Sequence, residues 1–489
     1  MDISLASLFA VIATALYLSL LILYLKTKLH KTINLPPGKI GWPLIGEMKD
    51  FALSCARGEL EKFFSDRMGR YNSPDVFKTS LLGKKIVVFC SPAGNKFVFS
   101  NENKLVKSWV PDSASKIVLA DHADVEKTAK LQIRTFAYEF LKPDVIQKYI
   151  KTMDSIISQH LDQEWAQKQT LTVYPIVQKL LFSLSCSIFM GIEDKNLTRK
   201  LEDQFEIVTS GLFSMPFDLP GTKVRRGMRA GYEMRSELRK IVRQKRSSEN
   251  KDGNSGSVNL LSYLLSATDS EGKLFSEEEI ACIVLAVLIG SQHTTSSLIT
   301  NLVYFLADNP AVYDRVLKEQ LEIRKLKVDD KQLLNWEDTK RMKYSRIVLN
   351  ETLRIAPTAI GFFRDVIHDF NFAGYTVPKG WKIFLSPNTI HKNPKYYPNP
   401  DKFDPSRFEG KGPSPFTFTA FGGGPRMCPG NEFAPHLVLV FMHNLLIRFT
   451  WEKLIPKEKI IYDGAVNGPE HGLPIKLQRR CHEPEIDAS

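Results

Sequence analysis

The chain has 489 residues, of which 43% are hydrophobic and 25% are charged, and its formal net charge is +12. A chain of this length and composition can bury a large core, which excludes a disordered protein. The Lys and Arg residues form no block interleaved with aromatic residues, so we expect no nucleic acid partner. A basic surface suits anionic lipid or an acidic protein partner instead.

The N-terminal segment reads as a membrane anchor. Residues 3–25 are uncharged and predominantly apolar, and a helix of this length can cross a bilayer core. Lys26, Lys28 and Lys31 follow directly, so the positive-inside rule places the rest of the chain in the cytosol. A cleaved signal peptide fits less well, because the charges lie behind the apolar block and no small-x-small site follows.

A proline- and glycine-rich stretch, "LPPGKIGWPLIGE", occupies 35–47 and predicts a stiff connector, so we take 26–47 as a linker. Residues 76–91 predict a β-hairpin around a Gly-centred turn. Most segments from 125 to 350 have helical periodicity, broken by a polar loop at 247–257. Strand-like pieces return at 371–385. The fold class is mainly α with small β-sheets (α+β), with one large catalytic domain over 48–489.

One predicted helix is unusually long. Ser276 followed by three glutamates is a capping box with acids in the first turn, and Pro310 ends the helix. Its middle carries the polar patch "LIGSQHTTSS", residues 288–297. Burying so many hydroxyl and amide groups is costly unless they find partners, so the patch calls for a function.

The six cysteines lie far apart and include no CxxC pair, which argues against a zinc site and against a disulfide framework. A stretch near the C-terminus reads F-x-x-G-x-R-x-C-x-G through Phe421, Gly424, Arg426, Cys428 and Gly430. Adjacent glycines let the backbone approach a large flat group, and a nearby positive charge favours the thiolate of a cysteine. The alternative is a turn with a buried, inert cysteine.

This ten-residue signature resembles that of the cytochrome P-450 superfamily of haem-thiolate monooxygenases, and the resemblance extends over essentially the whole chain. It implies the cytochrome P-450 fold and a haem (iron protoporphyrin IX) with an axial thiolate from Cys428 as the metal ligand. By the same resemblance, Arg426 meets a haem propionate, Phe421 packs against the thiolate loop, and Gly430 completes the signature.

Further motifs carry the same resemblance. "ETLR" and "FDPSR" supply Glu351, Arg354 and Arg407, which match the family's buried Glu-Arg-Arg network, a structural rather than catalytic feature. Two further positions match arginines that bind propionates, Arg364 and Arg134. In the helix motif W-x-x-x-R, Lys130 stands where the family has tryptophan. Lys130 can still reach a carboxylate as a point charge, although it and Arg134 could also be solvated helix charges.

The polar patch of the long helix aligns with the family's oxygen-activation motif. The resemblance implies that Thr294 supports oxygen activation and that Gly290 permits local opening of the helix. Where the family usually has an acidic residue before the threonine, this chain has His293. Histidine titrates near neutrality and can relay protons; the alternative is that His293 only packs, with protons arriving through water held by Thr294, Thr295 and Gln292.

Several longer stretches, among them "FSNENKLV" and "LLNWEDTKRMKYS", are similar to plant enzymes that oxidise pentacyclic triterpenes of the oleanane or β-amyrin type. Such a substrate is large, rigid and apolar. We expect the pocket walls to come from apolar segments at 109–118, 210–221, 286–294 and 356–363.

The sequence therefore predicts a single-pass endoplasmic reticulum protein with a cytosolic catalytic domain, which receives NADPH electrons through a reductase and oxidises a triterpenoid C–H bond. A haem-thiolate isomerase or dehydratase that needs no NADPH is one alternative. A membrane protein that binds haem and lipid without turnover is another.

Overall fold

The computed structural model describes residues 14, 17–18, 34–42, 45–81, 83–119, 135–212, 214, 218–252, 259–268, 272–329 and 332–480. The predicted anchor at 3–25 lies outside these residues except for positions 14 and 17–18. Lys130 and Arg134 also lie outside them.

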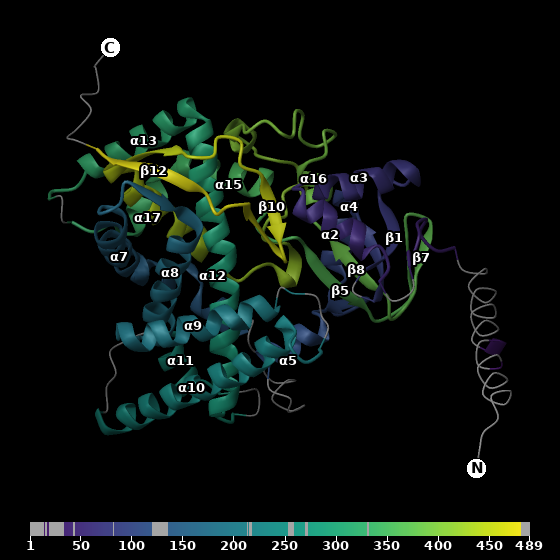
Figure 1. The fold of residues 1–489 in the computed structure, drawn as a ribbon, viewed down its shortest axis with the longest axis horizontal. Helices are drawn as coiled ribbons and strands as arrows, with labels where there is room; N and C mark the ends of the chain where they lie inside the picture. The colour runs from purple at the N-terminus through teal and green to yellow at the C-terminus, as the bar shows by residue number, and fades with distance from the viewer. Residues whose placement is uncertain are drawn as a thin grey trace.

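Helices form most of the described chain (Figure 1). In chain order they are α2 (Met48–Ala56), α3 (Leu60–Arg70), α4 (Pro92–Ser100), α5 (Asp112–Val118), α7 (Pro143–His160), α8 (Val173–Ser185), α9 (Lys195–Leu212), α10 (Lys223–Asp252), α11 (Leu260–Ser266), α12 (Glu277–Asp308), α13 (Pro310–Lys325), α14 (Trp336–Arg341), α15 (Lys343–Ile355), α16 (Asn388–His391) and α17 (Phe433–Arg448). Residues 135–140 are also helical. Short turns of other helix types are η2 (Leu161–Trp165), η3 (Cys186–Met190), η4 (Pro405–Phe408) and η5 (Gly424–Arg426).

Helix α12 runs through the middle of this helical body, with α9, α10 and α11 around one end (Figure 1). The predicted capping box is confirmed: Ser276 Oγ accepts from Glu279 N, and Glu279 Oε2 accepts from Ser276 N. Pro310 starts α13, and α12 ends at Asp308. The helix continues without a break through Gly290.

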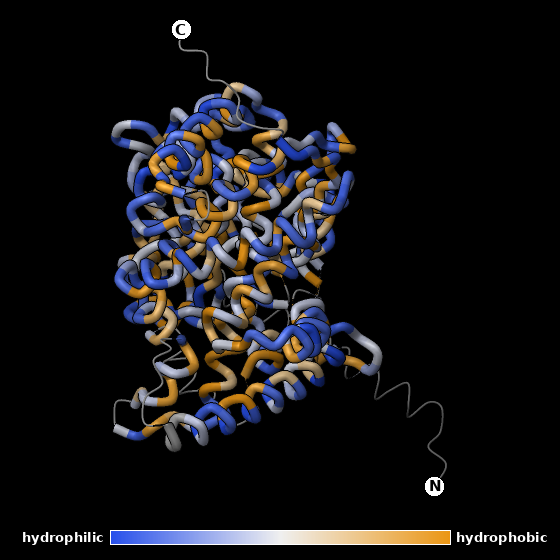
Figure 2. Tube along the Cα trace, turned by 90° about the vertical axis from the view of Figure 1, so that its left-hand side faces the viewer, coloured by the Kyte–Doolittle hydropathy of each residue, from blue (hydrophilic) through white to orange (hydrophobic). Residues whose placement is uncertain are grey.

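Two helical segments of the described chain, Val173–Met190 and Glu277–Asp308, are long and apolar enough to cross a membrane. Each has 67% of its most apolar stretch buried inside the protein, where α8 and α12 pack against each other. They form the core of the folded domain. Apolar and polar residues alternate along the outer helices, so that apolar faces can turn inward (Figure 2).

The main sheet lies to one side of the helical body, next to α2, α3 and α4 (Figure 1). Its strand order is β1-β2-β8-β5-β3. The strands are β1 (Val76–Leu81), β2 (Lys84–Phe89), β3 (Val106–Ser108), β5 (Phe362–Val366) and β8 (Lys382–Leu385). The predicted hairpin at 76–91 is confirmed as the antiparallel β1–β2 pair, in which Val76 faces Phe89. Gly83 makes the turn with φ of +71°.

The described residues also form three smaller sheets: β4 (Thr170–Thr172) with β12 (Pro474–Arg479) and β9 (Phe449–Lys453), β6 (Phe370–Phe372) with β7 (Tyr375–Val377), and β10 (Ile460–Asp463) with β11 (Val466–Pro469). The strands predicted within 371–385 are thus confirmed as parts of β6, β7 and β8. The β10–β11 hairpin reaches the segment after α15, where Ala359 bridges Val466 and Ile360 N donates to Ala465 O.

The prediction of a loop starting at residue 247 is wrong, because α10 continues to Asp252. Polar residues such as Glu and Lys remain good helix formers when they face solvent, so the polarity of this segment did not mark the helix end.

The connector before α2 lies against the domain. Asn34 Nδ2 donates to Gly374 O, and Lys78 N donates to Pro37 O. Gly38 has φ of +136°, and a Cβ there would lie 2.1 Å from Lys78 O. Only glycine permits this close approach of two backbones.

Candidate active site

The signature cysteine lies on a loop that closes on itself. Cys428 N donates to Phe421 O at 2.8 Å, so the first apolar residue of the signature and the cysteine form the two sides of one turn. Cys428 is half-buried, whereas Cys55, Cys90, Cys186 and Cys282 are buried. Burial raises the pKa of the Cys55 thiol to about 12 and that of Cys90 and Cys186 higher still, so these thiols stay protonated. None of the five described cysteines forms a disulfide.

The glycines of this loop allow it to press against the end of α4. A Cβ at Gly423 would lie 2.6 Å from the ring of Phe99, and a Cβ at Gly424 would lie 2.7 Å from Phe99 O. Gly424 also has φ of +63°, a left-handed conformation that favours glycine. The glycines therefore fix the position of Arg426 relative to α4.

The two described arginines expected at the propionates meet at one carboxylate. Arg364 on β5 donates from Nε to Glu102 Oε2 at 2.6 Å, and Nε of Arg426 on η5 lies 3.4 Å from Glu102 Oε1. The side chains of Glu102 and Arg364 are buried, while that of Arg426 is 25% exposed. The structure thus brings together Arg364 and Arg426 from segments that are remote in sequence.

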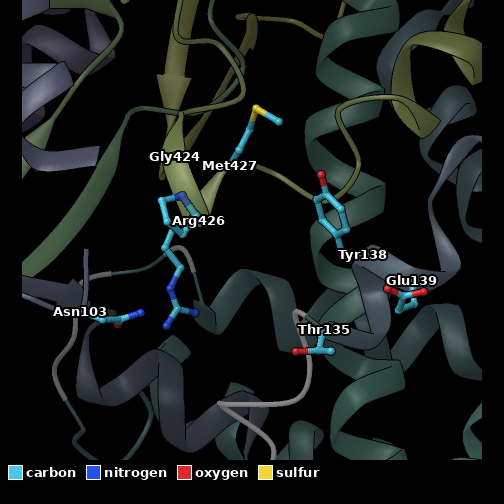
Figure 3. Close-up of a pocket in the computed structure, with 8 residues that line it drawn as sticks. Asn103, Thr135, Tyr138, Glu139, Gly424, Arg426 and Met427 are labelled. Atoms are coloured by element: carbon cyan, nitrogen blue, oxygen red, sulfur yellow. The ribbon is translucent and has the colours of Figure 1, made fainter. Parts of the chain in front are cut away.

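A cavity of about 430 Å³ lies beside Arg426. Its lining residues are Asn103, Thr135, Tyr138, Glu139, Gly424, Pro425, Arg426 and Met427. Figure 3 shows the side chain of Arg426 extending toward Asn103, with Thr135, Tyr138 and Glu139 on the other side of the pocket. One wall therefore comes from the cysteine loop, and the opposite wall comes from residues that follow the undescribed segment holding Lys130 and Arg134.

The polar patch of α12 has two parts. Toward its C-terminal side the hydroxyls are satisfied inside the fold: Ser296 Oγ donates to Gln292 O, and Ser297 Oγ donates to Asn467 Oδ1 on β11. Toward its N-terminal side, Gly290 is exposed and Thr294 is half-buried. Thr294 Oγ1 donates to Gly290 O at 2.9 Å, which leaves its lone pairs able to accept a hydrogen bond.

His293 points toward α8. Its Nδ1 lies 3.0 Å from Gln178 Nε2 and 3.2 Å from Tyr174 Oη, and its ring stacks on Phe205 of α9. Because an amide nitrogen only donates, Nδ1 acts as the acceptor in that contact. Burial lowers the pKa of His293 from 6.5 to about 4, so the ring is neutral near pH 7.

Glu351, Arg354 and Arg407 are brought together as the sequence implied. Arg354 donates from Nε and Nη2 to the two oxygens of Glu351 at 2.7 and 2.8 Å, and Nε of Arg407 lies 3.5 Å from Glu351 Oε1. Glu351 and Arg354 are fully buried. Arg354 also donates to His391 O, and His391 Nε2 accepts from Thr419 N just before the cysteine loop. The network therefore connects α15 to that loop.

Comparison with known proteins agrees with this geometry. A family model described as Cytochrome P450 matches residues 36–472. The chain is 49% identical to protopanaxadiol 6-hydroxylase of Panax ginseng over 444 residues, which cover 91% of this chain and 93% of that enzyme. The chain belongs to the cytochrome P450 family.

Other P450s show a similar match. Beta-amyrin 28-monooxygenase of Medicago truncatula is 45% identical over 472 residues, which cover 96% of this chain and 98% of that enzyme. Among solved structures, retinoic acid-bound cyanobacterial CYP120A1 matches with a TM-score of 0.79 at 28% identity, over 92% of this chain and 100% of that one. The mainly helical fold with small sheets is the P450 fold.

A P450 carries a haem ligated by a cysteine thiolate, and the residues present fit that group. Cys428 is the half-buried one of the described cysteines, and a Cβ at Gly430 would touch its sulfur at 3.7 Å, so glycine leaves room beside it. Arg364 and Arg426 supply guanidinium groups that can bind carboxylates. A soft thiolate with nearby guanidinium groups is the donor set that iron and two propionates need.

Sequence reasoning missed Glu102, Tyr174 and Gln178. "FSNENKLV" contains Glu102, but no local pattern marks its role, because Arg364 lies 262 residues further along the chain. The same holds for Tyr174 and Gln178, which lie 119 and 115 residues from His293. Only the folded chain reveals these partners.

Proposed function

We propose that this P450 is a membrane-anchored monooxygenase that oxidises a C–H bond of a triterpenoid, using O₂ and NADPH electrons delivered by a reductase. The observation that carries the proposal is the closed loop that presents a half-buried Cys428 beside two arginines. The names of the relatives support the substrate class, since they include a protopanaxadiol hydroxylase and several enzymes named for beta-amyrin.

Cys428 would ligate the haem iron, and the haem would supply the chemistry that activates O₂. Arg364 and Arg426 would hold the propionates, together with Lys130 and Arg134 from outside the described residues. Phe421 closes the loop through its carbonyl oxygen, while Gly430 leaves room beside the sulfur. Glu351, Arg354 and Arg407 hold the core beneath the loop and take no part in the chemistry.

Thr294 would face the oxygen side of the site. Its hydroxyl proton is donated to Gly290 O, so its oxygen can accept a hydrogen bond from water and hold that water in place. His293 is neutral and joins α12 to α8 through Gln178 and Tyr174. Its role as a proton relay stays a prediction. To relay a proton, the ring would have to become protonated at a pH well above its lowered pKa.

The substrate would lie against apolar segments at 109–118, 210–221, 286–294 and 356–363; positions 213 and 215–217 lie outside the described residues. Trp109 packs edge-on against Phe363 at 5.6 Å between ring centroids, which joins two of these segments. The β10–β11 hairpin meets the last of them at Ala359 and Ile360, so we add its tip to the proposed wall.

The anchor at 3–25 would hold the protein at the endoplasmic reticulum membrane, with the catalytic domain in the cytosol. This location suits an apolar substrate that partitions into lipid. The net charge of +12 suits a contact with an acidic reductase, whose association should weaken with salt.

Product analysis tests the function. The full chain is co-expressed with a plant reductase and with a panel of triterpene scaffolds that includes β-amyrin and protopanaxadiol. Oxygenated product that depends on NADPH supports the proposal, and the panel identifies the carbon attacked. Rearranged product without NADPH would instead establish an isomerase or dehydratase, and a bound but unchanged scaffold would establish a binding protein.

The thiolate assignment has its own test. We expect Cys428→Ser to abolish the red-shifted Soret band of the reduced carbon monoxide complex, because an alcohol does not replace a thiolate as ligand. Cys282→Ser is the matched control, since Cys282 is buried on α12, and it should retain the band. A Cys428→Ser protein that keeps the band contradicts the assignment.

A further inference from the structure

Glu102 occupies an unusual position for a carboxylate. It lies in the turn after α4, its side chain is 1% exposed, and it contacts guanidinium groups from two different elements. The distances are 2.6 Å to Nε of Arg364 on β5 and 3.4 Å to Nε of Arg426 on η5. A buried carboxylate is costly unless it is paired, and here both oxygens face a cation.

The turn holds Glu102 rigidly. Glu102 forms a β-bridge with Val106, and Asn103 adopts a left-handed conformation with φ of +63° while its N–H donates to Val106 O at 2.6 Å. Val106 begins β3, which pairs with β5 so that Ser108 faces Arg364. The carboxylate and the first arginine are thus fixed by the same ladder.

Glu102 contacts the inner nitrogen of each arginine. It binds Nε of Arg364, whose Nη1 donates to Phe363 O. Within the described part of the chain, no acceptor takes Nη2 of Arg364, and Arg426 is engaged through Nε alone. Nη2 of Arg364 and both Nη groups of Arg426 therefore have no acceptor among the described residues, and Arg426 lines the cavity next to Asn103 (Figure 3).

Two guanidinium groups that converge on one site repel each other, and neither can lose its charge. A carboxylate between them offsets this repulsion, and it holds Arg364 through a hydrogen bond and Arg426 through an ion pair. The group of three still carries a net charge of +1, which suits an acidic ligand. Because the arginines are oriented in advance, binding costs less side-chain entropy than it would for mobile side chains.

We propose that Glu102 is a positioning residue for haem, which holds Arg364 and Arg426 by Nε so that their Nη groups face the two haem carboxylates. This inference rests on the proposed role of the two arginines at the propionates. Glu102 acts through them and does not itself touch the haem.

The test measures haem retention rather than turnover. The full-length holoenzyme in detergent is mixed with excess apomyoglobin, and transfer of haem is followed by absorbance. We expect Glu102→Gln to lose haem roughly tenfold faster than the wild type, because a charge-assisted contact to each arginine is weakened. Glu102→Asp keeps the charge on a shorter side chain and should lie between the two.

A second experiment tests whether the effect of Glu102→Gln on haem retention depends on the two carboxylates of the haem. Wild-type and variant chains expressed under haem limitation are loaded with haem or with haem dimethyl ester, whose carboxylates are blocked. We expect the difference between wild type and Glu102→Gln to be large with haem and to vanish with the ester. A difference of equal size with both would overturn the proposal, because it would show that Glu102 only supports the fold.

Glu278→Gln is the matched control. Glu278 on α12 also joins two arginines, with Oε1 3.3 Å from Arg235 Nε and Oε2 2.9 Å from Arg239 Nη1, but these lie on α10. It should leave haem retention unchanged. If Glu102→Gln does not accumulate as folded protein, Glu102→Asp carries the same comparison of haem with its ester.

The arginines distinguish failure of this inference from failure of its premise. If Arg364→Gln and Arg426→Gln hasten haem loss while Glu102→Gln does not, the role of Glu102 is wrong and the propionate assignment stands. If neither arginine variant changes haem retention, the propionate assignment itself fails, and the inference fails with it.

Discussion

At the scale of single residues, the surroundings decide what a side chain can do. Cys428 and Cys186 carry the same thiol, but Cys186 is buried in the apolar core, which raises its pKa and keeps it protonated. Cys428 is half-buried on a loop two residues after an arginine, where a thiolate can form and bind iron. At His293, by contrast, burial lowers the pKa, so the ring does not take up a proton near neutral pH as an exposed histidine can.

The lowered pKa of His293 leads to a prediction about turnover. With a pKa of about 4, the ring is neutral throughout pH 6 to 8 and changes no charge there. We expect His293→Gln to leave the shape of the pH profile of NADPH-dependent product formation unchanged in that range. An inflection near pH 6.5 in the wild type that disappears in His293→Gln would show that the ring titrates and relays protons.

At the scale of elements, α12 combines a structural and a functional role along one helix. Ser297 and Asn301 both contact Asn467 on β11, with Ser297 Oγ and Asn301 Nδ2 each 2.9 Å from Asn467 Oδ1. Gly290 and Thr294 are less buried than this part of the helix. The polar patch therefore fixes the β10–β11 hairpin at one end, and at the other end it presents the half-buried hydroxyl of Thr294, for which we propose a role in oxygen activation.

The start of α12 provides a local test of stability. Ser276→Ala removes the side chain that accepts from Glu279 N, which typically costs about 1 kcal/mol. We expect amide hydrogen exchange in the first turn of α12 to quicken by about fivefold, which is what that free energy allows if opening is local. Ser248→Ala on the exposed face of α10 is the control, and equal changes at both sites would argue against a capping effect.

At the scale of the whole molecule, one large core joins α7, α8, α12 and α17, and it encloses several neutral histidines. Burial lowers the pKa of His160, His293 and His436 from 6.5 to about 4. It lowers the pKa of His391 and His443 to about 3. Between about pH 6.5 and 4, these histidines are therefore neutral in the folded domain but become protonated in the unfolded chain.

This difference predicts how stability depends on pH. Below pH 6.5 the unfolded chain binds protons at these histidines and the folded chain does not, so stability rises with pH and is lost as pH falls from 6.5 toward 4. Each histidine contributes up to about 1.4 kcal/mol per pH unit in that window. Urea denaturation of the holoenzyme at pH 7.5, 6 and 5 measures the loss, and a midpoint that stays constant above pH 5 contradicts it.

Carboxylates with a lowered pKa do not account for the same window. The pKa of Asp404 is lowered from 3.8, chiefly by its hydrogen bond from Ser406, and that of Glu237 is lowered from 4.5, chiefly by Lys240. Stability from such groups is lost only as the pH falls below about 4.5. A decline that begins near pH 6 therefore reports on the histidines.

Local patterns in the sequence predicted the cysteine loop, with the family resemblance that it carries, and several elements of the fold. Neighbouring residues are enough to recognise the ten-residue signature around Cys428, the hairpin at 76–91 and the cap at Ser276. The turn and the cap form through interactions between residues a few positions apart. The same reasoning failed at residue 247, where solvent-facing polarity continues a helix as readily as it ends one.

Tertiary structure alone decided which side chains meet. That Arg364 and Arg426 share Glu102, that His293 turns to Gln178, and that Asn467 holds α12 follow from contacts between residues far apart in the chain. A single sequence carries no local signal for such pairs, because each residue is compatible with many partners until packing selects one. The sequence by itself thus predicted, through its family resemblance, a thiolate that binds haem, and the fold decided how the residues around that cysteine are held.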